Sequence, residues 1–412
     1  MKRRVVVTGL GAVTSVGNNV QDMWEAIKAG KNGIDYITLF DTSDMKVKIA
    51  GEVKNLNPED YLDKRDVKRL DRTIILGLIA AQEAYQHAGL DKAEINRSRF
   101  GTFVASGIGG LNTINEESRK AHEKGADRVS PFFIPNAIIN LIGGHIAIKF
   151  QAKGPSLPVV TACSASTNAI GEAFRYIRDG YIDIAFAGGS EAAINELGVG
   201  GFTAMKALNM NNDINAASIP FDRRRSGFVM AEGAGILILE EYEHAKKRGA
   251  EILAELVGYG STCDAFHITA PDETAEGITN CLIQALNDAN IKPEDIDYIN
   301  AHGTSTPYND RLETLGIKNA FGEHAYSVNI SSTKSMTGHA LGAIGAIEAI
   351  ICVKAIQDDI VPPTINLLEP DPECDLNYTP NHAVKRTIKY ALSNSAGFGG
   401  QNAAIIFKKY RE

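Results

Sequence analysis

The sequence predicts an α/β fold with mostly parallel, buried sheets. Short apolar runs typical of buried strands alternate along the chain with longer segments of helical periodicity. Continuous apolar strands are typical of sheets that helices cover on both faces. The 412 residues suffice for two or three domain-sized units, or for one large duplicated fold.

The predicted elements begin with VVVTGLG, a buried strand that leads into a glycine-rich turn. Apolar and small residues then recur at helical spacing over Thr73–His87, and Gly89 is the expected C-cap of that helix. The next segments predict three strands and a helix: strands at 100–105, 159–162 and 182–187, and a helix that follows the second of these strands and ends at Gly180.

The opening glycines superficially fit a dinucleotide-binding fingerprint. Gly9 and Gly11 match its first two positions, but Thr14 stands where the third glycine belongs. A partial match of this kind is a weak signal. We therefore interpret the segment as a tight turn at the end of a strand.

A faint internal repeat indicates duplication. AYQHAGLDKAEI at 84–95 resembles ALNDANIKPEDI at 285–296, and residues 169–183 resemble residues 346–361. The sequence therefore predicts two similar halves, residues 1–250 and 251–412.

Composition and charge exclude several classes of protein. The net charge of −8 argues against a general nucleic-acid binder, which is strongly basic. No apolar run reaches the roughly 18–20 residues of a membrane span, since Glu348 and Lys354 interrupt Ala340–Ile356. The opening MKRRVVVTGLG leaves no room for a signal peptide, so we expect a cytoplasmic protein. Five cysteines without a CxxC pair argue against a disulfide framework or a zinc site.

Cys163 is a candidate nucleophile because it lies where a predicted strand turns into a helix. A thiolate is the reactive form of cysteine, and the unpaired N–H groups and dipole at a helix N-terminus favour it. The same N–H groups can stabilise the oxyanion of a bound thioester. From this local context alone, a buried structural cysteine is an equally good interpretation.

Two further segments favour catalysis. INAHGTSTPYND presents His302 in a loop with the hydroxyls of Thr304 and Thr306 beside it. SSTKSMTGHALGAIGAIEAI carries Lys334 and His339, and its small-residue helix carries Glu348. A single histidine is more often structural. Here two histidines lie beside glycines, each where a predicted strand runs into a loop, and a cysteine lies where a strand turns into a helix. Together they indicate an acyl-transfer site.

Four blocks, TACSAST, AHGTSTPYND, STKSMTGHALGAIG and SNSAGFGG, resemble the signature blocks of the elongating β-ketoacyl-[acyl-carrier-protein] synthases. A fifth block, PFDRRRSGFVMAEGAG at 220–235, matches as well, and the resemblance runs from VVVTGLG to GGQNAAIIF. SGIGG, with Ile108 at its centre, is most similar to the synthase II type.

This resemblance implies a thiolase-like duplicated fold, layered αβαβα, that works as a homodimer. It implies decarboxylative condensation of malonyl-[acyl-carrier-protein] with an acyl chain on the enzyme, in fatty acid elongation. Neutral imidazoles suffice for that chemistry, so neither a metal nor a cofactor is expected. The acyl carrier protein is the expected partner.

The resemblance also assigns roles to individual residues. The catalytic residues are Cys163, His302, His339 and Lys334, with Glu348 as the partner of Lys334. Phe398 is a gating residue whose backbone N–H joins that of Cys163 in the oxyanion hole. The remaining assignments are Thr304 and Thr306 for the pantetheine arm, and Ile108, Phe133 and Phe202 for the acyl pocket.

A basic helix is the expected docking site for an acidic carrier protein. In LDKRDVKRLDR, Lys64 and Lys68 lie four apart, and Arg65, Arg69 and Arg72 follow helical spacing, while three aspartates interleave. Arg128 and Lys206 extend the predicted site. A solvated, salt-bridged helix is the alternative interpretation.

Some positions depart from the family pattern. Tyr308 and Asn309 stand where small residues are common, Ala396 replaces a frequent aromatic, and Gln401 replaces a usual threonine. None of these changes removes a catalytic group.

Other functions stay open at this level. Thiolases use a second cysteine and initiating synthases use Cys–His–Asn, so the two histidine blocks argue against both. A polyketide ketosynthase subunit shares all of these motifs. A non-catalytic chain-length factor lacks the cysteine that this chain has at position 163.

Overall fold

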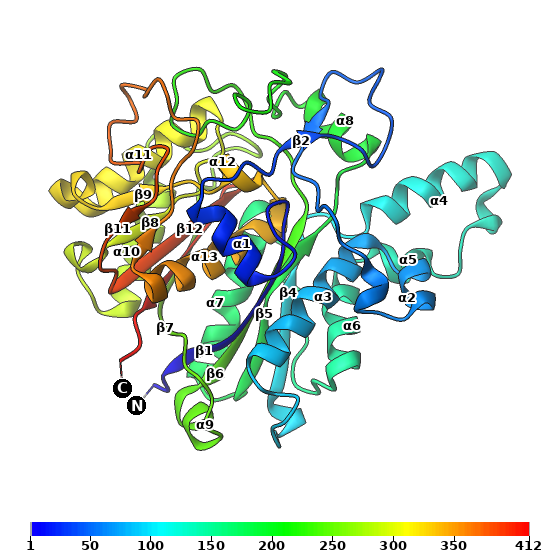
Figure 1. Cartoon of the computed structure of the whole chain (residues 1–412), viewed down its shortest axis with the longest axis horizontal. Coiled ribbons are helices and arrows are strands. Elements are labelled where there is room, and N and C mark those ends of the chain that lie inside the picture. The colour runs from blue at the N-terminus through cyan, green and yellow to red at the C-terminus, as the bar shows by residue number, and fades with distance from the viewer. Residues whose placement is uncertain (1, 412) are drawn as a thin grey trace.

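The computed structural model describes residues 2–411 and is built around a sheet of nine strands (Figure 1). The strands lie in the order β4-β5-β6-β1-β7-β13-β12-β8-β9. Their bounds are β1 Val5–Val13, β4 Phe100–Ala105, β5 Ile184–Glu191, β6 Gly233–Glu241, β7 Ala254–Cys263, β8 Tyr298–Asn300, β9 Asn329–Ser331, β12 Tyr390–Gly397 and β13 Gln401–Lys408. Two short pairs lie outside the sheet: β2 Asp35–Tyr36 with β3 Ile49–Ala50, and β10 Ile360–Val361 with β11 Val384–Lys385.

Helices cover and separate the two parts of this sheet. They are α1 Val20–Lys28, α2 Lys64–Arg69, α3 Arg72–His87, α4 Leu111–Lys124, α5 Phe133–Ala137, α6 Asn140–Phe150, α7 Ala165–Arg178, α8 Glu196–Ala204, α9 Tyr242–Lys247, α10 Glu276–Ala289, α11 Pro307–Phe321, α12 Lys334–Thr337 and α13 Ile344–Asp358. Short 3-10 turns are η1 Pro58–Asp60, η2 Arg97–Arg99, η3 Ala126–Arg128, η4 Ala162–Ser164, η5 Pro293–Asp295, η6 Gly322–Tyr326 and η7 Leu341–Ala343.

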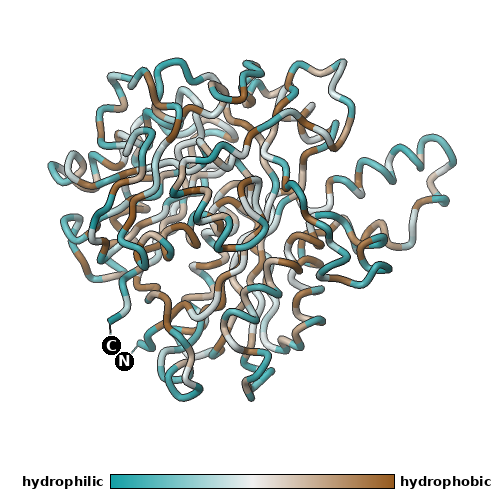
Figure 2. Tube along the Cα trace, in the orientation of Figure 1, coloured by the Kyte–Doolittle hydropathy of each residue, from teal (hydrophilic) through white to brown (hydrophobic). Residues whose placement is uncertain are grey.

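The layers run helix, strand, helix, strand, helix. α7 and α13 lie between the two parts of the sheet and share one apolar core with strands of both. α3 and α6 pack with β1, β4, β5 and β6 in a second core, and α10 and α11 pack with the other end of the sheet in a third. Figure 2 shows the hydrophobic residues concentrated along these inner elements. The layering αβαβα that the family resemblance implies is confirmed.

The prediction of a mostly parallel sheet is wrong for the centre of the sheet. Only β4–β5, β12–β8 and β8–β9 pair in parallel, while the central strands from β5 through β12 pair antiparallel. The β12–β13 hairpin shows one reason. Residues 398–400 alone join these two strands, and a short turn permits only antiparallel pairing.

The opening glycines do not form a turn. β1 continues through Gly9 and Gly11, where α3 crosses the strand closely. A Cβ on Gly11 would lie 1.9 Å from the carbonyl oxygen of Ala80, and one on Gly9 would lie 2.3 Å from that of Ala84. Glycine is therefore required at these positions by helix–strand packing.

The same packing recurs in the second half of the chain. On β7, a Cβ on Gly260 would lie 2.1 Å from the carbonyl oxygen of Cys281 in α10, and one on Gly258 would lie 2.4 Å from that of Ala285. A glycine pair on a strand beneath a helix thus occurs on both β1 and β7.

Other predicted elements agree with the structure to within a few residues. The helix predicted at Thr73–His87 is α3, and Gly89 has the left-handed φ of +64°. The strand predicted at 182–187 is β5, displaced toward Glu191.

The strand predicted at 159–162 is not formed. The extended pairing lies earlier, where the Thr102 N–H donates to Pro155 O and the Leu157 N–H donates to Thr102 O, both at 2.9 Å. Val160 is 53% exposed, so its apolar character does not reflect burial in this chain. Within residues 2–411, no helix has the length and apolarity to cross a membrane.

Candidate active site

One cavity of about 490 Å³ collects residues that are far apart in the sequence. Both halves of the chain contribute to its wall. The predicted residues that line it are Cys163, Lys206, His302, Thr304, Thr306, His339 and Phe398.

Cys163 occupies a sharp bend in front of α7. Ala162 has a left-handed φ of +51°, and the Ser164 hydroxyl donates to the Thr161 carbonyl at 2.8 Å, which fixes the bend. Burial raises the pKa of the Cys163 thiol to about 12, while the charge of Lys334 acts in the opposite direction. We expected the helix N-terminus to favour the thiolate, but burial outweighs it, and the resting group is a neutral thiol.

His302 follows β8 and is held through its backbone. Its N–H donates to Glu313 Oε1 at 2.6 Å, and the N–H of Gly303 donates to Glu313 Oε2 at 2.7 Å. Burial, and then the charge of Lys334, lower the pKa of His302 well below 6.5, so the imidazole is neutral.

His339 lies after α12 and faces His302. The two ring centroids are 5.4 Å apart and the rings are nearly perpendicular. The Leu341 N–H donates to Nδ1 of His339 at 3.1 Å, so the proton of a neutral ring must reside on Nε2. Burial and Lys334 lower the pKa of His339 as well, which makes the neutral form the resting one.

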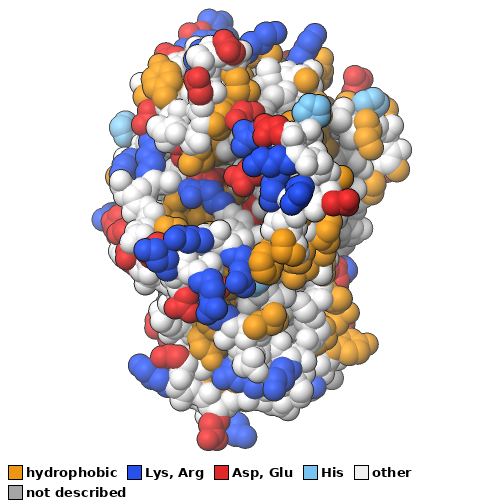
Figure 3. Space-filling view, turned by 90° about the vertical axis from the view of Figure 1, so that its right-hand side faces the viewer, with side chains coloured by type: hydrophobic (Ala, Val, Ile, Leu, Met, Phe, Trp, Pro, Cys, Tyr) orange, Lys and Arg blue, Asp and Glu red, His pale blue; other side chains and the backbone are white. Residues whose placement is uncertain are grey.

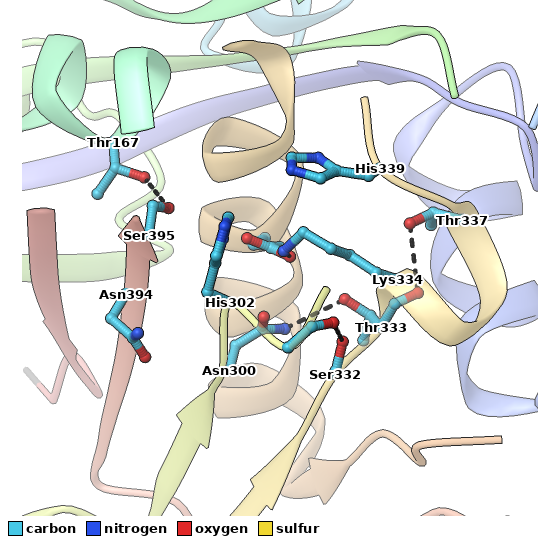
Figure 4. Close-up of polar contacts among 12 residues, drawn as sticks. Thr167, Asn300, His302, Ser332, Thr333, Lys334, Thr337, His339, Asn394 and Ser395 are labelled. Carbon is cyan, nitrogen blue, oxygen red and sulfur yellow. Dashed lines mark hydrogen bonds and ion pairs between the residues drawn. The ribbon is translucent and has the colours of Figure 1, made fainter. Parts of the chain in front are cut away.

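Lys334 begins α12 and extends toward the two imidazoles (Figure 4). Its ammonium group forms a buried ion pair with Glu348 on α13. Burial raises the pKa of Glu348 to about 7, and Lys334 opposes that rise. The charge of Lys334, which Glu348 offsets, therefore lies beside Cys163 and both histidines.

Phe398 lies in the hairpin between β12 and β13, next to the bend that carries Cys163. A Cβ on Gly397 would lie 2.6 Å from Thr161 O and 3.3 Å from the backbone N of Cys163, so the hairpin touches the bend closely. The Phe398 ring lies 6.5 Å from that of Phe202, as centroid distance. The structure therefore brings the expected gate and the nucleophile together.

The comparisons with known proteins agree with this geometry. The family described as "Beta-ketoacyl synthase, N-terminal domain" matches residues 2–245, and "Beta-ketoacyl synthase, C-terminal domain" matches residues 253–368. The chain belongs to the β-ketoacyl synthase family.

The similarity of this β-ketoacyl synthase to known proteins extends over its whole length. The "3-oxoacyl-[acyl-carrier-protein] synthase 2" of Synechocystis sp. is 51% identical over 411 residues, which is 100% of this chain and 99% of the relative. The protein of the same name from Staphylococcus aureus strain COL is 50% identical over 99% of each chain. A solved structure described as a type II PKS acyl-carrier protein in complex with its ketosynthase bound to the hexaketide is 38% identical, with a TM-score of 0.92 and complete coverage of both chains. The fold is thus the thiolase-like fold of the ketosynthases.

The residues expected at the acyl pocket divide into two groups in this synthase. Ile108 and Phe202 pack in the apolar cluster that includes Cys163. Phe133 lines a different hollow, of about 390 Å³, together with Arg65 and Arg69. Within one chain, Phe133 therefore does not line the pocket at Cys163, because α5 lies on the outer side of the first half.

The basic residues of α2 share that second hollow. Arg65, Lys68 and Arg69 line it, Lys64 is exposed on the same helix, and the Arg69 guanidinium lies 4.5 Å from the centre of the Phe132 ring. Figure 3 shows Lys and Arg side chains gathered on this face with hydrophobic side chains among them.

Three other basic residues lie differently. Arg128 is exposed at the end of η3, and Lys206 lies at the catalytic cavity, away from the hollow at α2. Arg72 does not extend α2, because the helix stops at Arg69 and Leu70 is extended, with ψ of 146°. Arg72 instead binds the buried carboxylate of Glu232 through two hydrogen bonds of 2.7 Å.

Sequence reasoning missed two buried carboxylates. Glu313 holds the backbone of His302 and also accepts from Asn394 Nδ2 at 2.8 Å. Glu191 accepts from the backbone N–H groups of Gly107 and Gly342, at 2.6 and 3.0 Å. The position of Glu313, three residues after Asp310 on the helix that follows the histidine loop, is the one sequence signal that could have indicated it.

The departures from the family pattern lie around the same cavity. Tyr308, Asn309 and Ala396 line it, and Tyr308 is 64% exposed at its mouth. Gln401 begins β13 beside Gly399 of the Phe398 hairpin. They lie at the cavity or beside the Phe398 hairpin, and Cys163, His302 and His339 stay in place.

Proposed function

We propose that this synthase condenses malonyl-[acyl-carrier-protein] with an acyl chain carried on Cys163 and releases a 3-oxoacyl-[acyl-carrier-protein] two carbons longer. One observation carries the proposal: a thiol at a sharp bend in front of α7 and two neutral imidazoles share one cavity. The 51% identity to a 3-oxoacyl-[acyl-carrier-protein] synthase 2 supports fatty acid elongation as the pathway.

The first half-reaction is acyl transfer. The sulfur of Cys163 attacks the thioester carbonyl of acyl-carrier protein, the thiol proton passes to the sulfur of the departing carrier, and the carrier leaves as its own thiol. The tetrahedral oxyanion accepts hydrogen bonds from the backbone N–H groups of Cys163 and Phe398. Because the thiol has a pKa of about 12, loss of its proton must accompany the attack.

The second half-reaction is decarboxylation and condensation. Malonyl-carrier protein loses CO₂, and the electron pair of the broken C–C bond forms a thioester enolate. Nε2–H groups of His302 and His339 donate to the enolate oxygen, and the carbon then attacks the acyl carbonyl on Cys163. The C–S bond to Cys163 breaks, and the sulfur takes up a proton from water, because the original thiol proton left with the first carrier protein. Lys334, paired with Glu348, sets the local charge.

Thr304 and Thr306 supply hydroxyls for the pantetheine arm. Their oxygens are 2.9 Å apart, and both residues line the cavity. Ile108 and Phe202 form the apolar wall for the acyl chain, supported by their packing with Cys163.

A homodimer is the proposed working unit. Apolar side chains on α5, α6 and the segment that follows them are exposed: Ile134 (57%), Ile138 (43%), Ile148 (69%), Leu157 (40%) and Val160 (53%). A second copy of the chain would cover them and could bring its own Phe133 to the acyl pocket of its partner. Sedimentation velocity tests the dimer, and Ile148→Lys should favour the monomer.

The carrier protein is the proposed partner, and α2 is its proposed docking site, extended by Arg128 and Lys206. The neighbouring ketosynthase that was solved with its acyl-carrier protein supports this class of partner. We further propose the halves 1–250 and 251–412 as the duplicated units, supported by the recurring glycine pairs, and a cytoplasmic location, which cell fractionation tests.

The decisive assay measures condensation with malonyl-carrier protein against acyl-carrier proteins from short to long. Elongation of saturated acyl chains supports the proposal, with Cys163→Ala as the inactive control. Repeated condensation without reduction on polyketone chains alone would instead identify a polyketide ketosynthase. Failure of Cys163 to become acylated by any acyl-carrier protein would overturn the proposal.

A further inference from the structure

The turn that carries the two threonines has an unusual backbone. Gly303 has φ of +36° and Ser305 has φ of +69°. A left-handed conformation at a residue other than glycine persists where surrounding contacts enforce it. The turn therefore depends on bonds from outside itself to keep Thr304 and Thr306 aimed into the cavity.

Those bonds come from residues 219–228, in the first half of the chain. The Gly227 N–H donates to Ser305 O at 3.1 Å, and the Ile219 N–H donates to the Ser305 hydroxyl oxygen at 3.0 Å. This segment contains PFDRRRSGF, from the fifth block that resembles the family, and the arginines of this block have no part in the chemistry above.

Arg225 makes the densest set of contacts to the turn. Its Nε donates to Thr306 O at 3.1 Å and its Nη2 donates to Pro307 O at 2.9 Å. Its Nη1 donates to Asp371 Oδ2 at 2.6 Å and to Asp222 O at 3.1 Å. The side chain is 4% exposed, so the guanidinium acts within the protein.

Two carboxylates balance the charge of this buried cation. Asp371 forms the ion pair at 2.6 Å, and Asp310 Oδ2 lies 3.5 Å from Nε of Arg225. Asp310 also accepts from the Phe221 N–H at 2.9 Å, which ties the two segments together again. A guanidinium can meet two carbonyls and a carboxylate at once because its N–H groups diverge in a rigid plane, which an ammonium group cannot reproduce.

We propose that Arg225 is a positioning residue for pantetheine: it fixes Thr306 and Pro307 through their carbonyls, so that the threonine hydroxyls meet the amide groups of the arm. This inference rests on the proposed function, in which Thr304 and Thr306 bind that arm. Arg225 is not a catalytic residue, since it does not line the cavity at Cys163.

The test compares two thioester substrates of one enzyme. Acyl-pantetheine carries amides that the threonines can bind, whereas the acyl thioester of ethanethiol carries none. In Arg225→Lys, we expect the rate constant for acylation of Cys163 by acyl-pantetheine at low concentration to fall about tenfold, mainly through KM, the scale of one lost hydrogen bond. Acylation by the ethanethiol thioester should stay within about twofold of the parent.

The matched control is the neighbouring residue. Arg224 pairs with Asp222 and is more exposed, and none of its hydrogen bonds reaches the turn among the described residues. Arg224→Lys should leave both acylation rates unchanged. A double-mutant cycle adds a second readout: in a Thr306→Val background, Arg225→Lys should lose most of its effect on acyl-pantetheine, because it acts through that residue.

Asp371→Asn keeps Arg225 but removes the charge of its ion-pair partner. It replaces Arg225→Lys in the test if the lysine variant does not fold. It should show the same substrate selectivity with a smaller loss, about two- to threefold. Equal losses for both thioesters, in either folded variant, would mean that Arg225 only stabilises the protein, and would overturn the inference. If the parent enzyme itself fails to load an acyl group from acyl-carrier protein, the proposed function fails instead.

Discussion

Leu341 holds His339 in one tautomer. The Leu341 N–H donates to Nδ1 of His339 at 3.1 Å, and Leu341 has a left-handed φ of +46°. A backbone N–H can only donate, so Nδ1 must accept and the ring proton must lie on Nε2. The strained residue thus prepares the donor that an enolate oxygen needs.

Replacing either histidine should cripple decarboxylation. His302→Ala or His339→Ala should lower the rate of CO₂ release from malonyl-carrier protein by about 10²–10³-fold, the scale of one lost oxyanion donor. Acylation of Cys163 should suffer less. Radiolabelled CO₂ release measures the first effect and mass spectrometry the second. A parental decarboxylation rate in either variant would contradict the assignment.

The two imidazole donors should also be insensitive to mild acid. Burial and Lys334 lower the pKa values of both histidines well below 6.5, so neither ring gains a proton as the pH falls from 8 to 6. The donors stay neutral over this range, and any change in rate should follow Glu348, whose pKa burial raises to about 7. A loss of activity centred near pH 6.5, the ordinary pKa of histidine, that persists in Glu348→Gln would show that a histidine titrates there.

Cys163→Ala should separate the two half-reactions. The variant should form no acyl-enzyme, yet it should still release CO₂ from malonyl-carrier protein, because the enolate donors are intact. Intact-protein mass spectrometry and CO₂ release measure the two properties side by side. A covalent acyl-enzyme on this variant would place the nucleophile elsewhere.

The Lys334–Glu348 pair should move the Cys163 thiol pKa in both directions. Lys334 lowers that pKa and Glu348 raises it. Lys334→Met should therefore shift the pH dependence of iodoacetamide labelling upward, and Glu348→Gln should shift it downward. Peptide mass spectrometry distinguishes Cys163 from the exposed Cys263. Shifts in the same direction for both variants would refute this electrostatic account.

The docking prediction depends on salt. Screening at 0.15 M limits useful charges to those within about 8 Å of the contact, and each exposed pair contributes about 0.2–1 kcal/mol. Reversing Arg65 alone should weaken carrier binding only a few-fold. Reversing Lys64, Arg65, Lys68 and Arg69 together should raise KM for acyl-carrier protein strongly at low salt, and less at high salt.

Turnover of a small pantetheine thioester provides the control for this fourfold variant. It should stay near the parent value because the cavity is untouched. An unchanged KM for the carrier at low salt would make α2 a solvated helix and place docking elsewhere.

A glycine pair tests the packing of the fold. Gly11→Ala should lower the free energy of unfolding by about 1–3 kcal/mol, because the new methyl collides with the backbone of α3. Gly200→Ala is the matched control: it lies in α8 with nothing within 4 Å, so alanine should stabilise the helix by about 0.5–1 kcal/mol. Chemical denaturation measures both, and equal stability of the two variants would contradict the packing argument.

Local chemistry is what the sequence by itself determined. Periodicity gave α3 and the strand at 100–105 to within a residue, because apolar spacing reports directly on local backbone structure. The motif residues at 163, 302 and 339 line one cavity in the structure, as the motifs predicted. The types of these residues and their neighbours in the sequence were sufficient for that prediction, and no distance between the residues was needed.

Only the tertiary structure decided properties that depend on distant segments. Whether Gly11 lies in a turn or in a strand that packs closely against a helix depends on α3, some 70 residues away. The direction of a strand depends on the connection that joins it to its neighbour in the sheet. The neutral state of Cys163 likewise follows from burial, which a helix N-terminus alone does not reveal. The carboxylate of Glu313 and the guanidinium of Arg225 hold the histidine loop from separate parts of the chain. Hydrogen bonds between such parts leave no periodic signal in the sequence, because only folding brings their donors and acceptors within reach.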